Sequence, residues 1–138
     1  MGFTSNNNNI SFIPVKRQLL RFQSATTGLF PEHSSDTEVG SVHSTIYSSM
    51  AIWSLYQAFK RIDDDRGKTY ELGQSAVCGL RGILKCWMVQ TPRLEKFKQH
   101  QTPLNALHSK FHLETGAEVY SVKEYNHLQA SNIFCTSS

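Results

Sequence analysis

The sequence lacks long apolar runs, and its uninterrupted apolar stretches are only a few residues long, as at residues 50–53. A membrane-spanning helix needs about 20 apolar residues, and the core of a signal peptide needs about 7–15. Neither kind of segment occurs in these 138 residues, so we predict an intracellular, cytoplasmic protein.

Paired cysteines are also lacking. Cys78, Cys86 and Cys135 are odd in number and form no CxxC motif, whereas a disulfide framework or a zinc ribbon needs closely spaced pairs. Within one predicted helix, Cys78 and Cys86 would lie about 12 Å apart along the axis, too far for a disulfide. The sequence therefore predicts free thiols.

The sequence has neither a large net charge nor long runs of like charges. Fourteen Lys and Arg against eleven Asp and Glu give a net charge of +3, and no basic run exceeds a pair such as Lys16-Arg17. Nucleic-acid binding needs clustered basic residues, so no nucleic-acid partner is predicted. With 39% hydrophobic residues, the chain can form about one globular domain.

Catalytic and cofactor-binding motifs are lacking: GxGxxG, GxxxxGK[ST], GxSxG and the kinase catalytic loop are absent. His108 and His112 have the spacing of HExxH but lack its carboxylate, and in a strand they would lie about 13 Å apart. The acidic run at 63–65 is flanked by Arg61 and Arg66, which favours a solvated loop over an acid/base pair. We therefore predict no catalytic, cofactor-binding or metal-binding residues and no cofactor.

Helical periodicity is present along most of the chain. Residues 15–22 predict a short amphipathic helix, and residues 42–62 predict an interior helix that is apolar on almost all sides. Residues 76–88 predict an amphipathic helix that Pro92 closes from outside. Between the first two helices, the polar residues 31–41 predict an exposed loop.

Three glycines and two tryptophans lie within the predicted helices. Gly73, Gly79 and Gly82 each cost about 1 kcal/mol relative to alanine in a helix, so we predict close helix-to-helix packing there. Trp53 and Trp87 occupy core-type positions, and packing is the predicted role of both side chains.

Two-residue alternation replaces the helical period after residue 106. Residues 107–113 alternate apolar and polar side chains, and Thr115-Gly116 separates them from residues 117–120, which predicts a β-hairpin inserted between helices. At the other end of the chain, the Ser- and Asn-rich residues 1–14 predict a disordered leader.

The last four residues, Cys135-Thr136-Ser137-Ser138, have the form of a C-a-a-X prenylation signal ending in serine. The two middle positions are polar, whereas this signal usually has aliphatic residues there. Unmodified Cys135 and farnesylated Cys135 are therefore both open.

Five separated segments resemble, in matching order, the family of regulatory α/β subunits of phosphorylase b kinase, and within it the β subunit. They are QSATTGLFP (23–31), RIDDDRGKTYEL (61–72), RGILKC (81–86), KFKQ (96–99) and EYNHLQ (124–129). The resemblance runs from Gln18 to Gln129 and corresponds to the N-terminal part of a subunit several times longer.

The resemblance implies a non-catalytic regulatory subunit that modulates the phosphorylation of glycogen phosphorylase in glycogen metabolism. The partners it implies are the α subunit, the catalytic γ subunit and calmodulin, and it also implies peripheral association with the cytoplasmic face of the plasma membrane. The implied fold class is all-α: a partial, glucoamylase-like (α/α)6 toroid with a small inserted β-hairpin.

The predicted organisation is a leader at 1–14, the N-terminal part of a glucoamylase-like helical domain at 15–129, and a tail at 130–138 that departs from the family. Asn126 also departs, standing where the family has glycine. We interpret the chain as a fragment, a truncated splice form or a mispredicted gene end. A few helices of a toroid would leave an apolar face uncovered, either a partner site or an aggregation hazard.

Two alternatives remain. One is a glucoamylase-like glycoside hydrolase or a sugar-binding remnant of one. In the glucoamylase-like pattern an Arg-Asp pair contacts sugar, but His43 and Ser44 stand at those positions and supply neither a bidentate cation nor a carboxylate. The glucoamylase catalytic carboxylates would lie beyond Ser138, and hydrolysis needs both. The other alternative is an unstable chain without function.

Overall fold

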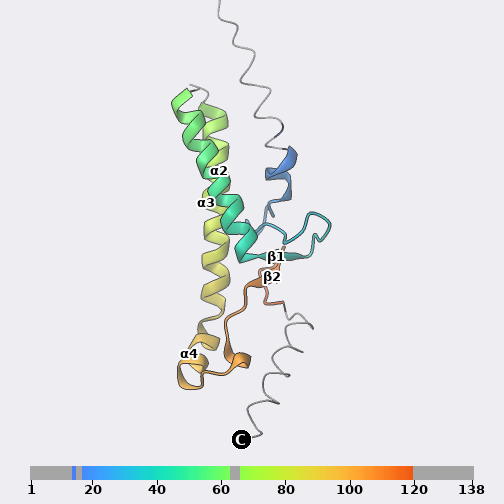
Figure 1. Ribbon diagram of the computed structural model, residues 1–138, viewed down its shortest axis with the longest axis vertical. Coiled ribbons are helices and arrows are strands. Elements are labelled where there is room, and N and C mark those ends of the chain that lie inside the picture. Colours follow the sequence, from blue (N-terminus) through green and yellow to red (C-terminus); the bar gives the residue numbers. More distant parts are fainter. Residues whose placement is uncertain (1–13, 15–16, 63–65, 120–138) are drawn as a thin grey trace, which may run out of the picture.

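Figure 1 shows a computed structural model of the protein, which describes residues 14, 17–62 and 66–119. The elements are, in chain order, η1 (Leu20–Phe22), β1 (Val39–Ser41), α2 (Val42–Ile62), α3 (Arg66–Val89), α4 (Thr91–Gln99), η2 (Pro103–Asn105) and β2 (Lys110–His112). Several predictions fall outside the described residues: the leader except Pro14, the acidic run at 63–65, the departure at Asn126, the tail and Cys135.

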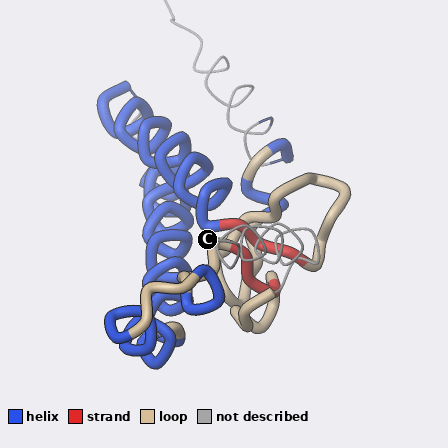
Figure 2. The backbone as a smooth tube through the Cα atoms, turned by 60° about the horizontal axis from the view of Figure 1, so that its bottom comes forward, coloured by secondary structure: helices blue, strands red, loops and turns tan. Residues whose placement is uncertain are grey.

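The two long helices α2 and α3 lie side by side and dominate the structure (Figures 1 and 2). The helix predicted at 42–62 is confirmed with the same bounds. The helix predicted at 76–88 lies within α3, which begins ten residues earlier. Pro92 stands in the first turn of α4, where a proline is tolerated because that backbone position needs no intrahelical donor.

The described core consists of two apolar clusters on one side of this helix pair. The first joins both helices to the sheet region, and the second joins them to the N-terminal segment; Figure 2 shows the sheet and loops on that same side. The buried members of the first cluster are Leu29, Val42, Ile83, Cys86, Phe111 and Leu113. Those of the second are Phe30, Ile52, Leu72 and Ala76.

The small sheet corrects one prediction. The strand predicted in 107–113 is present as β2, but it pairs antiparallel with β1, which lies in the predicted exposed loop at 31–41. Gly40 pairs with Phe111, and a side chain at position 40 would crowd Leu29 and Leu113, at 3.2 and 3.0 Å. The residues around this strand are polar, so the sequence did not indicate that its end is buried. Gly40 allows the strand to lie in close contact with Leu29 and Leu113.

The predicted turn at Thr115-Gly116 is present after β2. Gly116 adopts φ +70°, a left-handed conformation that glycine tolerates best. The backbone N–H of His112 donates to the carbonyl of Ala117 at 2.7 Å, and Phe111 forms an isolated bridge with Glu118. The hairpin is therefore short, and the partner of β2 in the two-stranded sheet comes from far earlier in the chain.

The helix predicted at 15–22 is reduced, among the described residues of that range, to the helical residues 17–18 and the 3-10 turn η1. The side chain of Gln23 accounts for this ending, because its Nε2 donates to the carbonyls of Gly28 at 3.1 Å and Ser75 at 2.8 Å. These bonds tie the chain to α3 and hold Gln23 in an extended conformation.

Within the described ranges, the architecture is mostly helical with one two-stranded antiparallel sheet. None of the helices described there combines the length and apolar character that crossing a bilayer requires. The longest of them, α2 and α3, are the elements whose outer sides define the candidate site below.

Candidate interaction surface

Two glycines set how closely α3 packs against its neighbours. A Cβ at Gly79 would overlap the Oγ of Ser49 on α2, and a Cβ at Gly82 would overlap the carbonyl oxygen of Thr27. Each glycine therefore sits where its neighbour occupies the space of a methyl group. The predicted close helix-to-helix packing is confirmed at Gly79, whereas the close neighbour of Gly82 is Thr27, which lies in a turn and not in a helix.

The side of the helix pair opposite the core carries large apolar side chains that nothing in the described chain covers. Trp53 is 46% exposed and Trp87 is 51% exposed, so the prediction that both pack in a core is wrong. We call this surface the α2–α3 face, and its members are Tyr47, Met50, Trp53, Leu80, Leu84, Trp87 and Met88. The prediction that α2 is interior on almost all sides is wrong for the same reason.

Small and medium side chains on the inner side explain why these larger ones point outward. Ala76 and Ile83 of α3, with Ile52 of α2, fill the space against the two clusters. Leu80 and Leu84 are 55% and 56% exposed, and they lie about 40–100° around α3 from Ala76 and Ile83. The predicted apolar stripe of α3 is therefore split between a buried and an exposed half.

A groove runs between the two helices on this face. Its volume is about 370 Å³, and its wall is mostly apolar, formed by Ser49, Met50, Trp53, Ser54, Ala76, Val77 and Leu80. The ring of Trp53 stacks on that of Tyr56 with centroids 4.8 Å apart, which fixes one edge of the groove. The groove can accept apolar side chains, but it contains no charged group.

The positions that correspond to the glucoamylase sugar-contacting pair lie at the start of α2. His43 is exposed and meets the ring of Tyr47 edge-on, with centroids 4.6 Å apart. Ser44 is half-buried, and its backbone N–H donates to the Oγ of Ser41 at 3.5 Å. Neither side chain supplies a carboxylate or a forked cation, so sugar binding of the glucoamylase kind has no support at these positions.

The two histidines considered for metal binding lie near β2 and do not meet. His112 is the last residue of that strand, whereas the Nε2 of His108 lies 3.8 Å from a carboxylate oxygen of Glu118. Among residues 14, 17–62 and 66–119, no three His, Cys, Asp or Glu side chains are grouped so that they could hold a metal ion.

An ion pair that the sequence did not reveal ties α4 to the hairpin. The guanidinium of Arg93 donates to Glu118 at 2.8 Å and to the carbonyl of Leu104 at 2.9 Å, and the Arg93 and Glu118 side chains are mostly buried. The two partners are 25 residues apart, so no local pattern could have indicated the pair.

Gln90, between α3 and α4, is almost fully buried and bonds twice to the backbone of His108. Its Nε2 donates to the carbonyl at 3.1 Å, and its Oε1 accepts from the N–H at 2.5 Å. We expect Gln90→Ala to lower the free energy of unfolding by about 2 kcal/mol, because it removes two hydrogen bonds from the Gln90 side chain to the backbone of His108. Hydrogen exchange at the His108 amide would accelerate in the variant, and unchanged exchange would contradict this role.

Cys78 and Cys86 are free, as predicted. Burial raises the pKa of the Cys86 thiol above its ordinary value, because desolvation disfavours the thiolate. Cys86 is therefore a packing residue of the first cluster and a poor nucleophile near neutral pH.

Residues 8–130 match the family described as "Glycosyl hydrolases family 15", and the chain belongs to this family. With the helical architecture, this match confirms the predicted fold class, part of a glucoamylase-like helical toroid with a small sheet. The family description names a class of hydrolases, but the curated relatives carry a different description.

The chain is 62% identical over 115 residues to the probable phosphorylase b kinase regulatory subunit beta of Drosophila melanogaster, covering 83% of this chain and 10% of that protein. It is 39% identical over 118 residues to the probable regulatory subunit alpha of the same organism, covering 83% and 9%. The liver isoform of the alpha subunit of Mus musculus is 36% identical over 125 residues, covering 87% and 10%.

These similarities confirm the predicted resemblance to the regulatory subunits, and the identity to the β relative exceeds the identity to either α relative. The chain spans about a tenth of the length of the curated relatives it matches.

Proposed function

We propose that the protein is a non-catalytic regulatory element of the β type, which acts by binding other subunits of phosphorylase b kinase. The observation that carries this proposal is the 62% identity to a protein described as a regulatory subunit beta. Through these contacts it modulates the phosphorylation of glycogen phosphorylase, in glycogen metabolism.

The α2–α3 face supports a role in binding. Its seven large side chains are between 46% and 64% exposed, and they lie together on two adjacent helices. In soluble proteins, a contiguous apolar surface of this kind marks an interaction site. No reacting group accompanies it in the described part of the chain, which fits a regulatory rather than a catalytic protein.

The partners within this proposal are the α subunit, the catalytic γ subunit and calmodulin. Membrane association is a separate part of it, for which the C-a-a-X form of residues 135–138 is the sequence feature. Intact mass of the chain from a eukaryotic host tests it: an added farnesyl group on Cys135 supports peripheral anchoring, and an unmodified thiol removes it.

Co-purification tests the regulatory proposal. The tagged chain is co-expressed with the α and γ subunits and calmodulin, and each partner is then omitted in turn. We expect at least one subunit to be retained with the chain in near-equal amount, and kinase activity toward glycogen phosphorylase to change when the chain is present. Retention of no subunit under any combination would contradict the proposal.

The family match favours a second candidate, a sugar-binding or glycoside-hydrolysing protein. His43 and Ser44 weigh against it, and so do the regulatory subunits among the relatives. The chain incubated with malto-oligosaccharides should release no glucose and give no binding heat in calorimetry. Release of glucose in proportion to chain concentration would favour the hydrolase instead.

A further inference from the structure

Two Thr-Pro dipeptides lie near each other in the chain, Thr91-Pro92 and Thr102-Pro103. At no other place in the 138 residues does serine or threonine precede proline. Both threonines are exposed, so exposure alone does not distinguish them. Their backbone conformations and the hydrogen bonds of their hydroxyl groups do.

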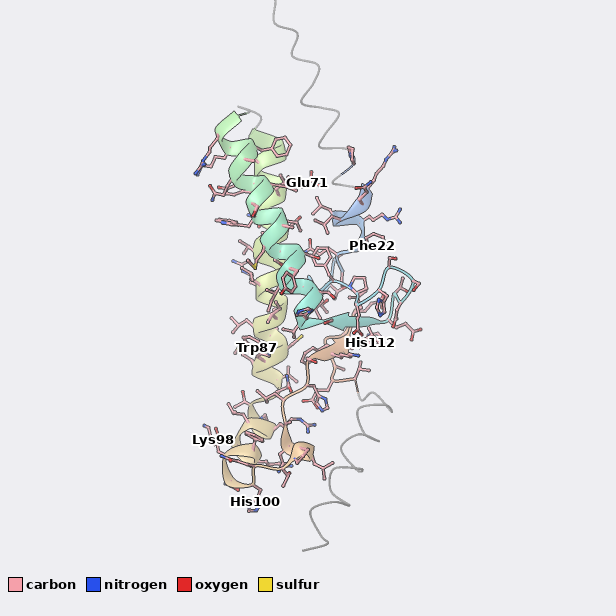
Figure 3. The ribbon with its side chains drawn as sticks, in the orientation of Figure 1. Phe22, Glu71, Trp87, Lys98, His100 and His112 are labelled. Atoms are coloured by element: carbon pink, nitrogen blue, oxygen red, sulfur yellow. The ribbon has the colours of Figure 1, made fainter. Side chains whose placement is uncertain are left out.

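Thr102 has an accessible hydroxyl in an extended stretch of chain. It lies between α4 and η2 with φ −106° and ψ 152°, the conformation that a following proline favours. Its hydroxyl has no hydrogen-bond partner among the described residues. Residues 98–104 are all exposed, and Figure 3 shows Lys98 and His100 at the lower end of the molecule, beyond Trp87. An enzyme can therefore reach the hydroxyl together with the chain on both sides of it.

Thr91 carries the same dipeptide in a different setting. It is the first residue of α4, and its hydroxyl donates to the carbonyl of Met88 at 2.7 Å. The residue before it, Gln90, is almost fully buried, and its side chain bonds to the backbone of His108. The chain around Thr91 therefore cannot become extended without breaking contacts of the fold.

The chemistry of phosphoryl transfer favours the first of these two settings. A protein kinase places the acceptor hydroxyl in line with the γ-phosphate of ATP, and an aspartate of its catalytic loop accepts the hydroxyl proton. A kinase whose pocket for the next residue offers no hydrogen-bond acceptor leaves a backbone N–H there unsatisfied. Proline has no such N–H, so a kinase of this kind selects threonine followed by proline.

We propose that Thr102 is the phosphate acceptor of a proline-directed protein kinase and that Thr91 is not. The bond between the γ-phosphorus of ATP and the Thr102 oxygen forms, the bond to the β-phosphate oxygen breaks, ADP leaves, and the hydroxyl proton passes to the kinase aspartate. The product carries about −1.5 to −2 charges at pH 7, two residues after His100. This inference does not depend on the proposed regulatory function.

Little of the fold has to open for the kinase to bind. The N–H of Thr102 donates to the carbonyl of His100 at 2.8 Å, and the carbonyl of Thr102 accepts from the N–H of Asn105 at 3.0 Å. Both bonds join neighbours within one short connection and involve no residue of the two apolar clusters. Exposed local bonds of this kind open at much lower free energy than the core.

Phosphate incorporation into the folded chain tests the proposal. The whole chain is incubated with a purified mitogen-activated protein kinase and Mg-ATP, and mass spectrometry of proteolytic fragments locates the modified residue. We expect about one phosphate per chain, on Thr102. Thr102→Ala should lower the initial rate about tenfold or more, whereas the matched variant Thr91→Ala should leave it within about twofold.

Two proline variants test the class of kinase. Pro103→Ala keeps the hydroxyl of Thr102 but adds a backbone N–H after it, so it should lower the rate about tenfold. Pro92→Ala is the matched change at the other dipeptide and should leave the rate within about twofold. Circular dichroism verifies that each variant keeps its helices. An unchanged rate for Pro103→Ala would overturn the assignment to a proline-directed kinase.

Peptides separate the effect of the fold from that of the local sequence. Two peptides, covering residues 84–98 and 95–109, carry the two dipeptides without the rest of the structure. Peptides this short form little helix in water, so both threonines can become extended. We expect the preference for Thr102 over Thr91 to be about tenfold stronger in the folded chain than between the peptides.

Three results would overturn the proposal. An equal preference in the peptides and in the folded chain would show that local sequence alone selects the threonine. Phosphate on Thr91 of the folded chain, at a rate equal to that on Thr102, would show that the hydrogen bond to Met88 gives no protection. Phosphate on neither threonine would show that Thr102 is not an acceptor.

Discussion

Replacing Gly82 with alanine is expected to lower the free energy of unfolding by about 2 kcal/mol, although alanine is the better helix former by about 1 kcal/mol. The added methyl group would occupy the position of the Thr27 carbonyl oxygen. That oxygen cannot move away freely, because the Thr27 hydroxyl donates to the carbonyl of Leu113 at 2.5 Å and its N–H donates to Ser24 at 3.2 Å.

Gly73→Ala is the matched control on the same helix. Its added methyl would meet only the edge of the Tyr56 ring, at 3.2 Å, and a ring at the end of a side chain can turn aside. We expect Gly73→Ala to be within about 0.5 kcal/mol of the parent chain or slightly stabilising. Chemical denaturation followed by circular dichroism measures both, and a stabilised Gly82→Ala chain would refute the close approach.

Phe111→Ala is expected to cost about 3–5 kcal/mol, the largest loss from a single substitution that we foresee. Phe111 has no exposed surface and links β2 to the cluster that holds Leu29 and Ile83. A single domain is stabilised by only about 5–15 kcal/mol in total, so the variant would be mostly unfolded at moderate denaturant.

Leu104→Ala serves as its control, since Leu104 is 54% exposed in η2. Its removal should change the free energy of unfolding by less than about 1 kcal/mol. The midpoint of urea unfolding, measured by circular dichroism for both variants, tests this expected difference in stability. Equal midpoints for Phe111→Ala and Leu104→Ala would mean that the sheet is not joined to the core.

Helix positions could be predicted from the sequence because helical periodicity is a local property. The bounds of α2 agree with the prediction, and the glycine contacts of α3 follow from the cost of glycine in a helix. The strand β1 could not be predicted, because its burial depends on β2, about 70 residues later, and its own composition is that of a loop.

The candidate interaction surface was only half predictable. The small number of helices predicts an uncovered apolar face, but periodicity assigns the members of that face to the core. Periodicity shows which residues share a side of a helix, and Leu80, Ile83, Leu84 and Trp87 all share one; it does not show which part of a wide stripe a neighbour covers. Gly79 and Ala76 face α2, so α2 covers the side of the stripe that carries small residues and leaves the side with the larger residues exposed.

The functional inference depends on the resemblance of five segments and not on chemistry, since the residues contain no catalytic pattern. The proposed regulatory role would leave no such pattern, because binding surfaces need apolar area and charge, whereas catalysis needs particular side chains at particular spacings.

The pairing of β1 with β2 also bears on the order of folding. It joins the chain immediately before α2 to the chain after η2, so it closes a loop of about 70 residues at an entropic cost of about 4 kcal/mol. The contacts within α2 and α3 are nearer in sequence and need no such closure. The helix pair can therefore form early, and the sheet should form last, so that protection of the Phe111 amide would report completion of folding.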